Sequence, residues 1–209
     1  MTHEPLVRMD IRSFLAWTGK DPRPGVRLLR QRLWQLRVAI GTATYVEDQL
    51  HQLMLGLAHL LTHHRNHTQI SHPILVLIDG RAWCDQYAAV FSYLVCQFFG
   101  LASRRIRILH SDGTNGHFTV EVYYSGGWHF FDPHSDHLSV YRDPHTRAVL
   151  SYDELVACPE IVAAEKNWFV GEDGIGKEGF FTRPPTSVNY CWQMRPKDCH
   201  FDGATQWPA

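Results

Sequence analysis

The stretch that decides the fold of this 209-residue chain is Cys84-Asp-Gln-Tyr-Ala-Ala-Val-Phe-Ser-Tyr-Leu-Val-Cys-Gln-Phe-Phe-Gly100. It is strongly apolar and ends on glycine, a residue well suited to the position just past a helix. The apolar run is interrupted by Ser92 and Gln97, and it falls short of the about 18–20 residues that a membrane span needs. The pattern predicts a buried helix in a globular core, with Cys96 as a small apolar residue inside it.

Strands are predicted directly after this helix. Residues 104–110 alternate between apolar and basic side chains, as a half-buried strand does. Residues 117–124 and 128–132 form two further candidate strands, and Ser125-Gly-Gly127 between them is typical of a tight hairpin. The region therefore reads as one helix followed by an antiparallel sheet.

The part of the chain before Cys84 reads mainly as helical. Apolar residues at helical spacing predict an amphipathic helix over residues 26–40 and a second helix that begins near Tyr45. Residues 19–25 are rich in Gly and Pro and predict a break between a short helix at residues 11–17 and the longer one. Residues 74–78 are apolar and β-branched, which suits either a short strand or a buried lead-in to the Cys84 helix.

The part after residue 140 carries weaker signals. Residues 151–157 could form a short helix, whereas residues 168–209 are rich in Gly, Pro and aromatic residues and show little periodicity. This tail either wraps the core or covers a site. The glycine-rich segment 171–176 lacks the Lys-Ser/Thr ending of a phosphate loop, so we interpret it as a flexible turn.

Composition limits the classes of function. A formal charge of −1 gives no reason to expect nucleic acid or an anionic membrane as a partner. Five arginines lie between Arg23 and Arg37, either as the solvated face of a helix or as a surface for an acidic partner. The first residues lack the pattern of a signal peptide, so a cytoplasmic location is expected. Five cysteines at scattered spacings predict neither a disulfide framework nor a zinc ribbon.

Three residues stand at junctions that suit thiol catalysis. Cys84 begins a helix, where unpaired N–H groups and the helix dipole favour an anion, and the reactive form of a thiol is its thiolate. His117 begins a strand and could take the thiol proton, and Asp132 at the end of the next strand could orient the imidazole. Each residue alone has an ordinary structural explanation. Their order and settings together predict a catalytic Cys-His-Asp set.

Other candidate residues leave alternatives open. Asp112, on the turn before His117, could replace Asp132 as the third member. Trp83 could bind substrate beside the nucleophile or simply pack. His63, His64 and His67 could hold a metal, or be the polar end of a helix. His134 and His137 could modulate the pH response of the site, or be exposed loop residues.

Residues 77–137 resemble the transglutaminase-like superfamily of papain-like cysteine enzymes. The matches are the Cys-led helix ending at Gly100, an arginine-bearing strand with Arg104 and Arg105, His117-Phe-Thr-Val-Glu-Val122, and Trp128-His-Phe-Phe-Asp-Pro133. The chain departs from the family pattern at Ala82, where a glycine is usual, and at Thr119, where an aromatic residue is usual.

The resemblance implies an α+β fold in which the Cys-bearing helix packs on an antiparallel sheet. We expect one domain over residues 1–209, with a helical part (1–72), a catalytic core (73–140) and an irregular part (141–209). The implied residues are Cys84 as nucleophile, His117 as base and Asp132 as orienter, with no cofactor and no metal. The implied chemistry is acyl transfer from an amide, peptide or thioester carbonyl of a peptide, protein or small molecule, to water or to an amine. The alternative is a non-catalytic binding module that keeps this fold.

Overall fold

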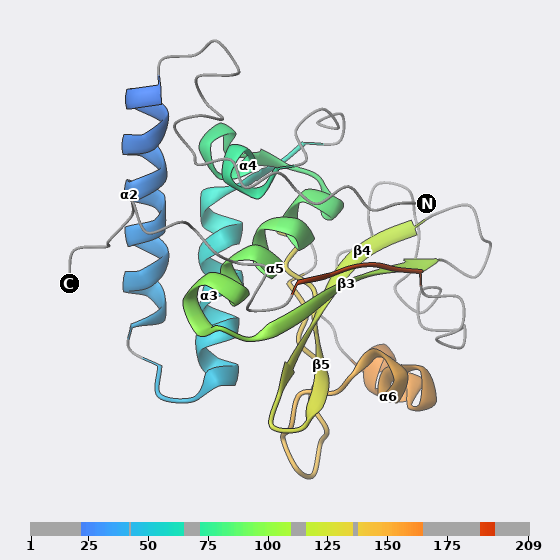
Figure 1. The fold of residues 1–209 in the computed structure, drawn as a ribbon. Coiled ribbons are helices and arrows are strands. Elements are labelled where there is room, and N and C mark those ends of the chain that lie inside the picture. The colour runs from blue at the N-terminus through green and yellow to red at the C-terminus, as the bar shows by residue number, and fades with distance from the viewer. Residues whose placement is uncertain are drawn as a thin grey trace.

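The computed structural model describes residues 22–41, 43–64, 72–109, 116–135, 138–164 and 189–194. It combines a helical N-terminal region with a small antiparallel sheet, so the expected mixture of helices and strands is confirmed (Figure 1). Helix α5 (Cys84–Phe99) is the central element, and it packs against the sheet on one side and against the earlier helices on the other. The predicted helix at residues 11–17 and most of the tail at 168–209 lie outside the described residues.

Helices α2 (Pro22–Ile40) and α3 (Val46–Leu60) lie side by side and bury leucine-rich faces in one core with α5. The second helix begins where its periodicity predicted. The first begins earlier than expected, so the predicted break at residues 19–25 is wrong in its second half. Prolines fit there because the first turn of a helix has N–H groups with no acceptor within the helix, so the missing proline N–H costs nothing.

Residues 74–78 are helical, and the interpretation of this run as a strand is wrong. They belong to α4 (Pro73–Asp79), which has proline at its first position. Gly80 follows with φ 83°, and its N–H donates to Val76 O at 2.8 Å. These start and stop signals outweigh the β-branched composition of the run. The helix α4 is held against α2 by Arg32, whose guanidinium donates to Leu77 O.

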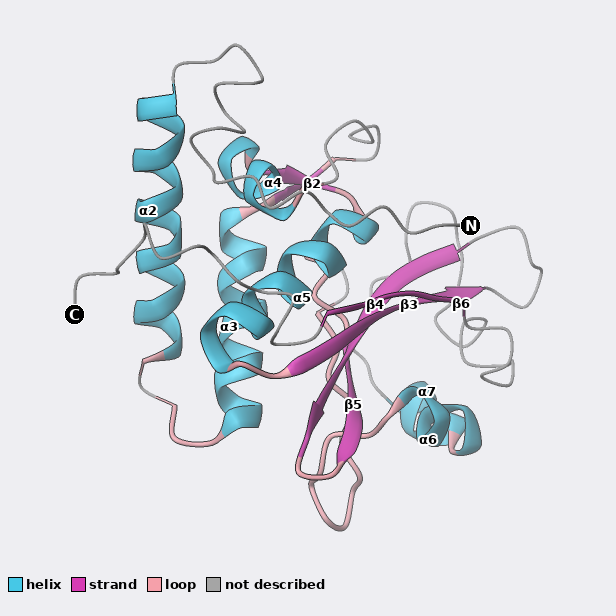
Figure 2. Ribbon diagram, viewed as in Figure 1, coloured by secondary structure: helices cyan, strands magenta, loops and turns pink. Residues whose placement is uncertain are grey.

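The main sheet has the strand order β5-β4-β3-β6, and every neighbouring pair is antiparallel (Figure 2). Its strands are β3 (Ala102–Leu109), β4 (Gly116–Tyr124), β5 (Gly127–Phe131) and β6 (Asn189–Met194). The first three lie within two residues of the predicted bounds. The two-residue turn between β4 and β5 has positive φ at Ser125 (49°) and Gly126 (88°), the backbone that tight hairpins require. The strand β6 was not predicted.

The two faces of the sheet bury different groups of residues. One face meets α5 through Val120, Val122 and Phe131. The opposite face meets α6 (Tyr152–Ala157) through Ile106, Ile108 and Phe130. The short helix predicted at 151–157 is confirmed, with Ser151 accepting a hydrogen bond from the Glu154 N–H as its N-cap. It is followed by α7 (Pro159–Ala164), which was not predicted.

Two short strands were also missed. The strand β1 (Thr62–His63) follows α3 and pairs in parallel with β2 (Arg81–Ala82), which immediately precedes Trp83 and α5. The backbone carries this pairing one residue further, because His64 N–H donates to Ala82 O at 2.9 Å. The pair brings the end of α3 to the start of α5, the helix that begins at Cys84.

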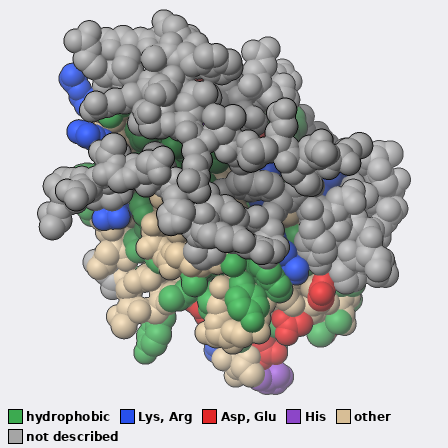
Figure 3. All heavy atoms as spheres, viewed as in Figure 1, with side chains coloured by type: hydrophobic (Ala, Val, Ile, Leu, Met, Phe, Trp, Pro, Cys, Tyr) green, Lys and Arg blue, Asp and Glu red, His purple; other side chains and the backbone are tan. Residues whose placement is uncertain are grey.

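Charge is distributed unevenly over the surface. On the face drawn in Figure 3, basic side chains lie along the edge formed by α2, and acidic ones lie toward the side where α6 lies, with basic atoms beside them. The arginines Arg27, Arg30 and Arg37 are exposed, as a solvated helix face requires. Within the described ranges, no helix has both the length and the apolar character needed to cross a membrane.

One cysteine departs from the expectation for this chain. Cys96 is disulfide-bonded rather than a free thiol, whereas Cys84 and Cys158 are free. Disulfides persist mainly in oxidising compartments. The disulfide of Cys96 does not favour the expected cytoplasmic location, which stays a prediction.

Candidate active site

Cys84 occupies the first position of α5, at the end that faces the start of β4. The turn is fixed by Gln86, whose side-chain oxygen accepts the Trp83 N–H at 2.7 Å. Trp83 O in turn accepts the N–H groups of Gln86 and Tyr87, at 3.0 and 2.9 Å. Cys84 is 6% exposed, so its thiol lies just below the surface. The sequence expectation of a cysteine at a helix start is confirmed.

His117 and Asp132 are brought together by the hairpin that joins β4 to β5. His117 Nε2 lies 2.7 Å from Asp132 Oδ2. The two residues are 6% and 0% exposed, respectively. The backbone of Asp132 is fixed by a bridge to Ser139, with N–H···O distances of 3.0 and 3.2 Å. The carboxylate therefore has a defined position beside the imidazole.

The imidazole of His117 also reaches the thiol. Burial acts to lower the pKa of His117, but the charge and hydrogen bond of Asp132 and a side-chain hydrogen bond with Cys84 outweigh it and raise that pKa to about 10. Since Asp132 occupies Nε2, the other ring nitrogen is left for the thiol. A protonated His117 lies between the Asp132 carboxylate and the Cys84 sulfur, so one imidazole faces both side chains.

A group of aromatic and histidine rings lies against His117, and sequence reasoning found it only in part. The ring of His134 lies edge-on to the rings of His117, Tyr87 and His63, with centroid distances of 5.6, 5.2 and 4.6 Å. His63 also meets Trp83 edge-on at 5.9 Å. Tyr87 is recognisable in the sequence as the residue three positions after Cys84, one helical turn on. His63 could not be placed there, because the two-residue strand β1 leaves no periodic pattern.

The remaining candidate residues have mixed outcomes. Trp83 is half-buried at the start of α5, and a role in substrate binding stays a prediction. Asp112, His67 and His137 lie outside the described residues, so Asp112 stays an untested rival of Asp132. In the part of the chain that the structure describes, no three His, Cys, Asp or Glu side chains are grouped as metal ligands would be.

Both departures from the family pattern lie close to the site. Ala82 is fully buried in β2 and pairs with His63. Thr119 is fully buried in β4, two residues after His117. Among the described residues, no group forms a hydrogen bond with its hydroxyl oxygen.

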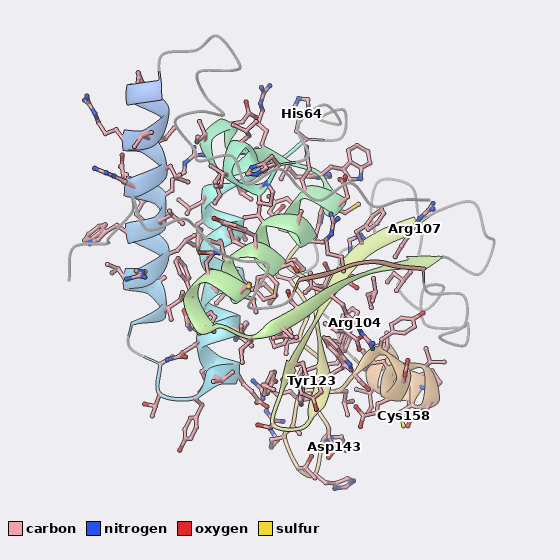
Figure 4. The ribbon with its side chains drawn as sticks, in the orientation of Figure 1. His64, Arg104, Arg107, Tyr123, Asp143 and Cys158 are labelled. Carbon is pink, nitrogen blue, oxygen red and sulfur yellow. The ribbon has the colours of Figure 1, made fainter. Side chains whose placement is uncertain are left out.

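The second free cysteine lies elsewhere in the molecule. Cys158 follows α6 and is half-buried (Figure 4). Arg104, on β3, lies beside the same helix, on the face of the sheet opposite α5. Cys158 therefore provides an internal comparison for the reactivity of Cys84.

The comparisons with known proteins yield a distant likeness in structure. No family model matches the sequence, and no curated protein matches it. A solved crystal structure of a TGase matches with a TM-score of 0.46 and 16% sequence identity. The match covers 68% of this chain and 37% of the TGase chain, so this chain spans little more than a third of that protein's length. The likeness concerns part of the fold and carries no assignment of activity.

Proposed function

We propose that this protein is a cysteine enzyme that forms an acyl-enzyme on Cys84. The observation that carries the proposal is the position of His117, buried between the carboxylate of Asp132 and the thiol of Cys84. A buried charge is costly unless a function or a partner compensates for it. Here the partner of the imidazolium is a nucleophile at a helix start, which is the arrangement that nucleophilic catalysis by a thiol needs.

In the proposed reaction, Cys84 carries the acyl group and His117 gives and then takes up a proton. The Cys84 sulfur attacks the carbonyl carbon of an amide, peptide or thioester, and the carbonyl oxygen takes up the negative charge. When the intermediate collapses, the bond to the leaving group breaks and His117 gives that group its proton. An acceptor, either water or an amine, then loses a proton to His117 and attacks the acyl-enzyme. Cys84 leaves as the thiolate, and the ion pair is restored.

The start of α5 supplies a candidate donor to the oxyanion. The Trp83 N–H is engaged by Gln86 and does not take part. The Cys84 N–H is at the first helical position, where no acceptor within the helix exists. Such a donor beside the attacking sulfur could stabilise the charge that develops on the carbonyl oxygen.

The test is covalent labelling followed by intact-mass spectrometry without reductant, so that the disulfide of Cys96 stays closed. Wild type is incubated with iodoacetamide at pH 6, and separately with panels of acyl thioesters, glutaminyl peptides and peptide esters. We expect fast labelling of one thiol and an acyl adduct, both lost in Cys84→Ala and retained in the matched variant Cys158→Ala. His117→Ala should slow the labelling by roughly 10²-fold.

The opposite outcome would favour the binding-module alternative. If Cys84 reacts no faster than a free thiol, and His117→Ala leaves that rate unchanged, the proposed function is wrong. The acceptor is identified in the same experiment by whether the adduct decays in water alone or only after an amine is added.

A further inference from the structure

We infer that His134 is a positioning residue, which holds the His117 imidazole in the orientation that serves both Asp132 and Cys84. The inference rests on the proposed function for the role of His117, but the contacts of His134 stand independently of it. His134 is not part of the Cys-His-Asp trio. It lies two residues after Asp132, and its N–H bonds to the Asp132 side chain in a local turn.

The backbone of His134 fixes the carboxylate. Its N–H donates to Asp132 Oδ1 at 3.2 Å, while Oδ2 of the same carboxylate meets His117 Nε2 at 2.7 Å. With both oxygens engaged, the carboxylate plane cannot rotate without breaking one of these bonds. The backbone of His134 thus fixes the orientation in which the Asp132 carboxylate faces His117.

The ring of His134 packs against the imidazole itself. It is 4% exposed, and its plane is nearly perpendicular to that of His117, at 86°. Edge-to-face contacts of this kind have a defined geometry and resist rotation of either ring.

Rigid neighbours support His134 from the other sides. Tyr87 meets it at 64° and is itself anchored, because its hydroxyl donates to Leu61 O at 2.7 Å. His63 covers it from β1 at 75°. Because Tyr87 lies on the nucleophile-bearing helix, His134 connects that helix to the base. Removing its ring would leave a cavity that these anchored neighbours cannot fill.

Three variants separate positioning from simple stability. His134→Ala removes the ring but keeps the backbone N–H, His134→Phe keeps a flat ring, and His129→Ala is the control. His129 is a half-buried histidine that stacks on Tyr124 at 3.8 Å, and its loss removes an imidazole without touching the trio. Thermal unfolding first confirms that each variant is folded at the assay temperature.

Two readouts are measured on the folded variants. The first is the downfield proton resonance of the His117 Nε2–H in its bond to Asp132, identified by its absence from His117→Gln. The second is the rate constant for labelling of Cys84 by iodoacetamide. We expect His134→Ala to lose the resonance and to react at least about tenfold more slowly, since small misplacements of reacting groups are costly. His134→Phe should recover most of both signals, and His129→Ala should match wild type.

An unchanged resonance and rate in His134→Ala would overturn the inference, and so would a His134→Phe variant as impaired as His134→Ala. If His134→Ala does not fold, His134→Leu fills the volume without a flat ring and should show the same losses. The failure of the proposed function is distinguishable. In that case wild-type Cys84 reacts as a free thiol, while the resonance still reports whether His134 holds His117.

Discussion

The carboxylate of Glu121 accepts the backbone N–H of Tyr152 at 2.8 Å, although the two residues are 31 positions apart in the chain. Glu121 is 1% exposed, and its second oxygen meets Arg104 on the neighbouring strand at 2.7 Å. Burial raises the pKa of Glu121, while the Tyr152 N–H and Arg104 act in the opposite direction. One carboxylate therefore connects two strands of the sheet to the first residue of α6.

This connection predicts a large effect of mutation. Glu121→Ala removes the ion pair of the partly buried Arg104 and the hydrogen bond of the buried Tyr152 N–H, and should reduce the free energy of unfolding by about 3 kcal/mol. Urea unfolding would measure it. Arg81→Gln is the control, because it breaks the more exposed pair with Asp79 and should change little. Equal effects of the two variants would contradict the prediction.

The His117–Asp132 pair predicts that stability falls as pH rises. The pKa of His117 is raised from 6.5 to about 10 in the folded protein, so the folded state holds a proton that the unfolded state releases above about pH 6.5. The stabilisation is present in full below that pH and is lost as the pH rises toward 10. Urea unfolding at pH 6, 8 and 9.5 should show this decline in the free energy of unfolding. The measurement is made on Cys84→Ala, which has no thiol at position 84 to titrate but keeps Asp132 beside His117.

In that background, the further change Asp132→Asn should flatten this pH dependence, because it removes the charge that holds the proton. A decline as steep as with Asp132 would show that other groups cause it. A rise in stability over the same pH range would contradict the raised pKa of His117.

Replacing Thr119 by valine should make the protein more stable. Its buried hydroxyl oxygen has no hydrogen-bond partner among the described residues, and an unsatisfied buried polar group costs about 1–3 kcal/mol. Thr119→Val keeps the shape and removes the hydroxyl, so the melting temperature should rise. Thr119→Ser, which keeps the hydroxyl and loses a methyl group, is the matched comparison and should lower it. A lower melting temperature for Thr119→Val would mean that the hydroxyl is satisfied.

Replacing Gly80 by alanine tests the contact between α2 and α4. Both Gly80 (φ 83°) and Gly100 (φ 65°) have left-handed backbones, so alanine at either should cost about 1–2 kcal/mol. Of these two glycines, only Gly80 would bring the new Cβ against another described residue, 2.7 Å from a nitrogen of Arg32. Gly80→Ala should therefore be more destabilising than Gly100→Ala in thermal unfolding. Equal losses would show that Arg32 moves aside without cost.

The sequence predicted best where one pattern is long and uninterrupted. The helix from Cys84 and the hairpin from His117 to Asp132 have such patterns, and their bounds are correct within about two residues. The run at residues 74–78 was assigned by composition, and its helix depends instead on the flanking Pro73 and Gly80.

The surroundings of the site were harder to predict for a different reason. His134 contacts His117 from 17 positions away, through the loop after β5. His63 contacts His134 in turn from 71 positions away, through a two-residue strand pair. Neither carries a period that a sequence pattern can reveal. What was visible at His134 was only its place two residues after Asp132, and contact distances were needed to distinguish a buried ring from an exposed loop residue.

The pairing of β6 with β3 has a consequence for how the chain reaches its native state. Ser103 pairs with Met194 across 91 positions, whereas β3, β4 and β5 pair with near neighbours in the chain. Pairings this distant form slowly, because a long loop must close before they contribute. Until residues 189–194 dock, the backbone donors and acceptors along one side of β3 stay open to any other strand. During synthesis and refolding, self-association through β3 is therefore the hazard that this distant strand must prevent.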